Sequence, residues 1–275
     1  MANLSTLPPE ITRTILENLP INSFLAFGLT SKNNHAIQSH SLSSLRLGVF
    51  HSRLSGMVCV SERTSDRCYT HTFQAVLSKA QSRNQKMVIR NQNASIRVIV
   101  SQYSHTLRDL EVSLWELQEP VVKSIAQLKN LRGLSIRLDH PCTSFLDVGR
   151  SFWEISPSST VWNGLFAKSD QDQVLRRLQS LNLERAGITD YQLEQLMNNN
   201  LMMRDLRLQK CLNLTSETFQ YLARSNKGRP LKTLYFTKYH GKEIDNRILE
   251  YIGELTNLDV SEPSSDWFFD VLTTL

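Results

Sequence analysis

The chain has 275 residues, of which 40% are hydrophobic and 21% are charged, and its formal net charge is +5. This length fits one large domain or two ordinary ones, and the composition is typical of a globular chain rather than a collagen-like or disordered one. Apolar runs are only a few residues long, whereas a helix that crosses a bilayer needs about 20. We therefore expect no membrane association. The first residues do not resemble a secretory signal, so we expect the protein in the cytoplasm or nucleus.

The positive charge is concentrated in residues 51–110, which hold nine Lys or Arg against three Asp or Glu. Residues 111–275 hold 19 against 21. A local excess of this kind indicates either a solvated face or contact with nucleic acid or an acidic partner. The aromatic and glycine-rich signatures of RNA-binding modules are missing around it, so we expect no nucleic-acid partner.

The sequence contains no recognisable catalytic or cofactor motif. It has no glycine-rich phosphate loop, no GxSxG turn and no HExxH pair. The four cysteines are too widely spaced for a disulfide scaffold or a paired CxxC zinc site. We therefore predict no catalytic residue, no cofactor and no metal. The nearest approach to a metal cluster matches no known zinc spacing: His51, Cys59, Cys68 and His71.

Three short helices are predicted in the first forty residues. The first helix begins at a proline pair followed by Glu10, because proline at a helix start loses no hydrogen bond and an acidic residue there favours the helix dipole. Its apolar side chains recur at helical spacing until Pro20. The second helix carries Phe24, and the third is capped by Ser31. This unit has more apolar residues than one small core can bury, so we expect a protein partner to cover some of them.

This segment resembles an F-box, over about residues 4–45. The residues that carry the resemblance are Leu7-Pro8-Pro9-Glu10-Ile11, Ile15-Leu16, Leu19-Pro20, Leu25, and Ser31-Lys32 before Ile37. The resemblance implies binding to the Skp-type adaptor that joins a substrate receptor to a cullin-RING ubiquitin ligase. It also implies which residues would contact that adaptor: Leu7, Pro8, Glu10, Ile11, Ile15, Leu16, Leu19, Pro20 and Leu25.

The rest of the chain repeats a pattern of the form LxxLxL. Its central residues are Leu110, Leu134, Leu181, Leu206, Leu234 and Leu258, at intervals of 24, 47, 25, 28 and 24. Four helix-start blocks follow, each with apolar residues at offsets 0, 5 and 8, which predicts a helix after the strand. They begin at Leu117, Ile188, Leu214 and Ile244, and Thr189, Thr215 and Asp245 can cap three of them. An earlier, weaker strand is predicted at Met87–Ile89.

These repeats resemble a leucine-rich repeat array of the cysteine-containing kind, most clearly at Leu206 to Thr215 with Cys211. In such an array each unit donates a short parallel strand and a helix, and stacking buries the apolar faces in an arc. We therefore predict an α/β chain with an F-box at 1–48, a helical linker at 49–80 and a leucine-rich repeat solenoid at 81–275. The irregular stretch 139–177, with five aromatic residues, is either a degenerate repeat or an inserted loop. A closing helix is predicted after Ser265.

The two resemblances together imply the substrate-recognition subunit of an SCF-type ubiquitin ligase, which needs no catalytic residue of its own. The rival interpretations are a scaffold that binds the adaptor or another protein without acting in ubiquitination, and a hydrolase hidden in 139–177. Side chains that flank the strand leucines should point outward. Among these we predict four residues that bind an unknown protein target: Arg137, Glu184, Arg207 and Tyr235.

Overall fold

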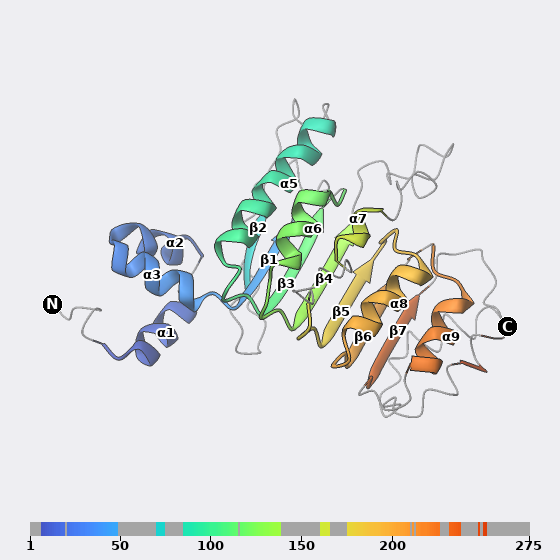
Figure 1. Cartoon of the computed structure of the whole chain (residues 1–275). Helices are drawn as coiled ribbons and strands as arrows, with labels where there is room; N and C mark the ends of the chain where they lie inside the picture. Colours follow the sequence, from blue (N-terminus) through green and yellow to red (C-terminus); the bar gives the residue numbers. More distant parts are fainter. Residues whose placement is uncertain are drawn as a thin grey trace.

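A computed structural model gives the fold, and it begins with three helices followed by a parallel sheet that carries helices on one face (Figure 1). None of the helices in the described part of the chain is long and apolar enough to span a membrane. The predicted strand at Leu258 and the predicted helix after Ser265 lie outside the described residues. The structure describes residues 7–19, 21–48, 70–74, 85–114, 116–138, 160–165, 175–209, 211, 213–225, 231–237, 247, 250 and 251.

The three predicted N-terminal helices are confirmed as α1 (Pro9–Glu17), α2 (Ile21–Thr30) and α3 (Lys32–Ser41). The helix start at Pro9 follows the prediction, and Glu10 lies in the first turn. Ser31 caps α3, because its hydroxyl oxygen accepts a hydrogen bond from the backbone N–H of Asn34 at 3.1 Å. Leu16 of α1 and Phe24 of α2 are buried and form the start of the hydrophobic core.

Gly28 allows α2 and α3 to approach closely. The buried carboxamide of Gln38 on α3 lies where a Cβ at position 28 would stand. The amide nitrogen of that side chain donates to the carbonyl oxygen of Phe24 at 2.7 Å. A larger residue at position 28 would therefore displace a buried group from its hydrogen bond.

We expect Gly28→Val to lower the free energy of unfolding by about 1 to 3 kcal/mol, because the Gln38 carboxamide would lose its buried acceptor. Urea denaturation of the full chain measures this loss. Ala26→Val is the matched control, since Ala26 is an exposed residue of the same helix. Equal destabilisation by the two substitutions would show that the contact between Gly28 and Gln38 is unimportant.

Within the described residues the sheet has seven parallel strands, in the order β2-β1-β3-β4-β5-β6-β7. Its register confirms the predicted row of equivalent leucines: Leu110 pairs with Leu134, and the row continues through Leu181, Leu206 and Leu234. All five are buried. The strands are β1 (Ser44–Gly48), β2 (Thr70–Gln74), β3 (Asp109–Leu114), β4 (Gly133–Leu138), β5 (Ser180–Glu184), β6 (Asp205–Gln209) and β7 (Thr233–Thr237).

The helices that cover one face of the sheet follow its strands in chain order (Figure 1). Three of the four predicted helix-start blocks are confirmed, as α6, α8 and α9; the block at Ile244, with Asp245, lies outside the described residues. Thr189 caps α8 in a capping box with Gln192, and Thr215 accepts from the N–H of Glu217 in α9. The helices are α5 (Gln85–Gln102), α6 (Glu119–Ala126), α7 (Thr160–Asn163), α8 (Asp190–Asn199) and α9 (Ser216–Ser225).

The N-terminal part of the sheet differs from the prediction in three places. Met87–Ile89 belongs to α5 and not to a strand, because the buried residues Ile89, Ile96 and Val100 recur at helical spacing. Residues 70–74, within the expected helical linker, form the edge strand β2. The strand beside β3 is instead β1, which follows α3 directly and whose Leu45 pairs with Leu110.

The long interval between Leu134 and Leu181 contains no extra strand between β4 and β5, because these two strands pair directly. The described part of 139–177 is therefore a crossover connection that carries α7. Trp162 is buried in the core beside α6, as expected for an aromatic residue that fills the interior, and Leu165 is buried with it. The other four aromatics lie outside the described residues: Phe145, Phe152, Trp153 and Phe166.

The helical start and the sheet share one hydrophobic core. Leu16 and Phe24 belong to the same buried cluster as Leu45 of β1 and the leucines of the later strands. Polar contacts strengthen the junction, since the Thr106 hydroxyl donates to the carbonyl oxygen of Ser39 at 3.2 Å. The three helices therefore join the sheet at α3 and β1, and only residues 42–43 separate these two elements.

Candidate functional site

The outward face of α1 exposes two large apolar side chains. Ile11 is 50% exposed and Ile15 is 37% exposed, and their spacing of four residues places them on one side of the helix. Thr12 and Leu16 lie on the opposite, buried side. Exposed isoleucines grouped in this way indicate a surface that another protein covers.

The residues predicted to contact an adaptor divide into exposed and buried groups. Pro8 and Glu10 are exposed beside Ile11 and Ile15, and Leu7 and Leu19 are half-buried. Leu16 differs from the prediction, because only 1% of it is exposed and it packs in the protein's own core. Pro20 and the side chain of Leu25 lie outside the described residues.

Leu29, at the end of α2, was not among the predicted contact residues. It is 86% exposed, more than any other large apolar residue described. The exposure of Leu29 could not be predicted from the sequence, because α2 is apolar on several sides and the spacing of its apolar residues does not separate an inner from an outer face.

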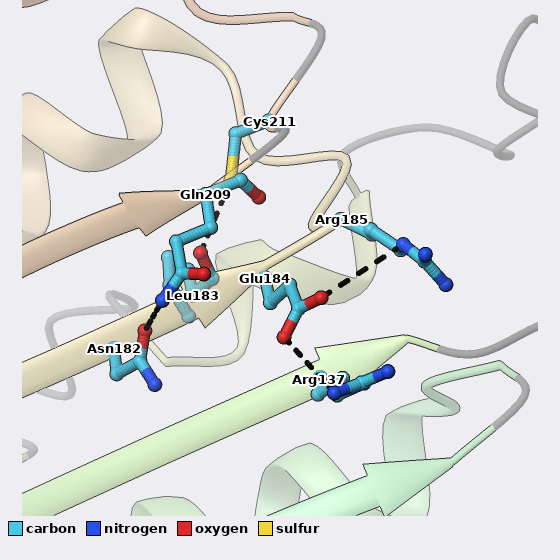
Figure 2. Close-up of polar contacts among 7 residues, drawn as sticks. All are labelled: Arg137, Asn182, Leu183, Glu184, Arg185, Gln209 and Cys211. Atoms are coloured by element: carbon cyan, nitrogen blue, oxygen red, sulfur yellow. Dashed lines mark hydrogen bonds and ion pairs between the residues drawn. The ribbon is translucent and has the colours of Figure 1, made fainter. Parts of the chain in front are cut away.

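The face of the sheet opposite the helices presents polar side chains in rows that follow the register. The middle row contains Arg46 of β1 and Glu111 of β3, whose guanidinium Nε and carboxylate oxygen are 2.5 Å apart. Hydrogen bonds continue across the next strands. The Asn182 amide nitrogen donates to the Ser135 hydroxyl at 3.1 Å. The Asn182 amide oxygen accepts from the Gln209 amide nitrogen at 3.3 Å (Figure 2).

The four residues predicted to bind a target lie at outward positions of four neighbouring strands, β4 to β7. Arg137 forms an ion pair with Glu184 at 3.4 Å, and Glu184 also lies 3.9 Å from Arg185 (Figure 2). Arg207 is exposed and Tyr235, its neighbour in the register, is half-buried. The structure therefore brings all four residues onto one continuous polar face.

A shallow hollow lies on this face near the start of the strands. Its polar lining includes Arg46, Asp109 and Ser180, and Gly133 leaves room for the Asp109 carboxylate. Burial raises the pKa of Asp109, although Arg132 and Arg108 beside it act in the opposite direction. The hollow is open to solvent and has a mixed polar and apolar lining, which suits contact with a protein side chain better than enclosure of a small molecule.

Cys211 is buried at the end of β6. Its Sγ lies 3.5 Å from the carbonyl oxygen of Leu183 and 3.6 Å from that of Gln209 (Figure 2). Burial raises the pKa of the thiol to about 12, so the group stays protonated at neutral pH. A protonated thiol is neither a nucleophile nor a metal ligand, which makes Cys211 a packing residue.

We expect Cys211 in the folded protein to react with a disulfide reagent at pH 8 at least about a hundredfold more slowly than in urea, because the thiolate is the reacting form. The measurement uses a variant in which Cys59, Cys68 and Cys142 are replaced by Ser. Because folding raises the pKa of the Cys211 thiol, its contribution to the free energy of unfolding is fully present below about pH 9 and is lost as the pH rises toward 12. Equal reaction rates with and without urea would show that the Cys211 thiol is not buried in the folded protein.

The described residues give no support to a metal site at the His and Cys residues between positions 51 and 71. No three His, Cys, Asp or Glu side chains come together among them as a metal site. His71 lies in β2, and His51, Cys59 and Cys68 lie outside the described residues.

Residues 4–42 match the family described as the F-box domain. This segment contains α1, α2 and α3 with the exposed residues Ile11, Ile15 and Leu29. No curated protein matches the chain. The match supports an F-box protein, and F-box domains bind Skp-type adaptors.

Proposed function

We propose that this chain is the substrate-recognition subunit of an SCF-type cullin-RING ubiquitin ligase. The F-box binds the Skp-type adaptor, and through it the cullin, while the sheet region binds a protein target. The observation that carries the proposal is the F-box match at residues 4–42, together with the apolar face that α1 leaves exposed there.

The sheet region, in this proposal, is a short leucine-rich repeat array that begins at β1. Three observations support it: the strands are parallel, their leucines form one buried row, and the helices cover one face. The edge strand β2 departs from a simple array, because it follows β1 in sequence yet lies outside it. A repeat array has the broad open face that protein recognition uses.

The shared core explains how such a receptor would work without a catalytic residue. A ligase receptor acts by proximity, since it raises the effective concentration of a target lysine near the conjugating enzyme. A flexible junction between the adaptor-binding helices and the target-binding sheet would lower this effective concentration. The continuous packing from Leu16 through Leu45 into the sheet favours a fixed separation between the adaptor and the target.

The target surface in this proposal is the polar face of β4 to β7, with Arg137, Glu184, Arg207 and Tyr235. Arg and Tyr are the residue types most often found at the energetic centre of protein interfaces. The ion pair between Arg137 and Glu184 and the two side-chain hydrogen bonds of Asn182 hold neighbouring side chains in place, which lowers the entropy lost on binding.

Affinity capture of the tagged chain from cells, with proteasome inhibition and mass spectrometry, tests target binding. We expect the double variant Arg207→Glu and Tyr235→Ala to lose captured target proteins while the adaptor remains. Arg224→Glu is the control, because Arg224 is an exposed cation on α9, on the helical side of the sheet. Identical sets of captured proteins for the wild type and the double variant would refute this target surface.

A further inference from the structure

The turns that lead into β3 to β7 carry an excess of positive charge. Among their described residues, these turns and the first residue of each strand hold seven exposed cations and two acidic residues, Asp109 and Asp205. We call the seven cations the basic edge: Arg108, Lys129, Arg132, Arg176, Arg177, Arg204 and Lys232. Residues 111–275 are slightly acidic as a whole, so this concentration is a product of the fold and not of composition.

Backbone hydrogen bonds stack the turns in a continuous row. The N–H of Arg132 donates to the carbonyl oxygen of Arg108, and the N–H of Lys232 donates to that of Arg204 at 2.7 Å. Gln179 occupies the equivalent position before β5, with Arg176 and Arg177 just ahead of it. At a strand spacing of about 4.8 Å, five strands span about 19 Å, which is the length of about six residues of extended chain.

Asp109 offsets part of this charge, because its carboxyl group lies beside Arg108 and Arg132. Within the part of the chain that the structure describes, no carboxylate forms an ion pair with Arg132, Arg204 or Lys232. Arg177 donates to the side-chain oxygen of Asn130 at 2.9 Å, which orients its guanidinium without compensating its charge. Asp205 accepts a hydrogen bond from Thr233 at 2.7 Å. The basic edge is therefore available for an anionic partner.

Apolar side chains lie within the basic edge. Leu201 is 62% exposed and Met202 is 47% exposed, in the turn that ends at Arg204. Surfaces that bind single-stranded nucleic acid use aromatic rings for base stacking, and Tyr103, the one aromatic residue beside the described turns, is buried. Five of the seven cations are arginines, whose planar guanidinium groups bind carboxylates through paired hydrogen bonds. This combination favours an acidic peptide over a nucleic acid.

We propose that the basic edge binds an extended, carboxylate-rich segment of a protein partner, with an apolar side chain seated against Leu201 and Met202. This inference rests on the proposed function, because it names the chemistry of the target that the sheet region would recognise. The edge begins beside the junction with the F-box helices, where Thr106 contacts Ser39. A segment bound there would lie close to the adaptor end of the chain.

Fluorescence anisotropy with a labelled synthetic peptide tests the proposal. The probe has about twelve residues, with Asp and Glu flanking two Leu, and its control carries Asn and Gln in place of the acids. We expect the full-length chain to bind only the acidic peptide. R108Q/R132Q/R204Q should weaken binding about tenfold, because each exposed ion pair contributes a factor of about 1.4 to 5. R90Q/R97Q/R224Q removes the same charge from exposed helix positions and should change binding less than twofold.

Four results would overturn the proposal. They are no binding of the acidic peptide, equal weakening by the two triple variants, binding of only a phosphoserine form of the peptide, and displacement of the peptide by a short oligouridine that binds more tightly. Adaptor binding is measured on the same proteins and depends on α1, so R108Q/R132Q/R204Q should retain it. Failure of the wild type to bind the adaptor would refute the proposed function and leave the peptide result standing.

Discussion

Replacing Leu206 by Ala should lower the free energy of unfolding by about 2 to 5 kcal/mol. Leu206 is completely buried and lies between Leu181 and Leu234 in the row of leucines that the register aligns. Its truncation leaves a cavity with no neighbouring group able to fill it, since both sides are occupied by equivalent leucines. Because a domain is stable by only about 5 to 15 kcal/mol, this loss is a large share of the total.

The adjacent residue provides the control for this experiment. Arg207 is exposed, so Arg207→Ala should change the free energy of unfolding by no more than about 0.5 kcal/mol in the same urea titration. Similar losses for the two variants would contradict the assignment of one face of β6 to the core and the other to solvent.

The largest expected effect on binding belongs to α1. Ile11→Asp combined with Ile15→Asp should weaken binding of the purified Skp-type adaptor at least about a hundredfold, because large side chains at the centre of an interface often contribute 2 kcal/mol or more each. Both isoleucines are exposed in the free chain, so the variant should stay folded. Isothermal titration calorimetry measures the affinity, and circular dichroism checks the fold.

A matched control for the α1 variant is Val98→Asp. Val98 is 58% exposed on α5, outside the segment that matches the F-box domain, so this change introduces the same charge at an apolar surface position. It should leave adaptor affinity within about twofold. A folded α1 variant that binds the adaptor as well as the wild type does would show that this face of α1 is not the adaptor surface.

The row of strand leucines was predictable because buried parallel strands and one-sided helices force a strict repeat on the sequence. The intervals of 24, 47, 25 and 28 residues placed Leu110, Leu134, Leu181, Leu206 and Leu234 in one register, and the structure aligns them so. The cap residues Thr189 and Thr215 were also predictable, since an N-cap needs a short side chain with an oxygen.

The start of the sheet was not predicted, although β1 carries the same pattern at Leu42, Leu45 and Leu47. These residues follow the F-box resemblance so closely that they were assigned to it. The short apolar run Met87–Ile89 was taken for a strand, because three residues cannot distinguish a strand from the buried face of a helix. The topology also requires β2 to pair on the outer side of β1, and no local pattern encodes that choice.

The candidate site residues were likewise predictable only in part. Periodicity placed Ile11, Ile15 and Leu16 on one apolar stripe, but only the structure separates the two exposed isoleucines from the buried leucine. The basic edge was invisible in the sequence because equivalent positions of successive turns lie 24 to 47 residues apart and the segment that contains most of the cations is slightly acidic. Stacking of the turns brings them together.

Capture of the cullin tests the central claim most directly. The full-length chain, tagged and expressed in cells, should bring down both the Skp-type adaptor and the cullin, and the variant with Ile11→Asp and Ile15→Asp should lose both while Val98→Asp keeps them. Capture of the adaptor without the cullin would instead indicate a scaffold outside the ligase. A folded wild-type chain that captures neither protein would contradict the account.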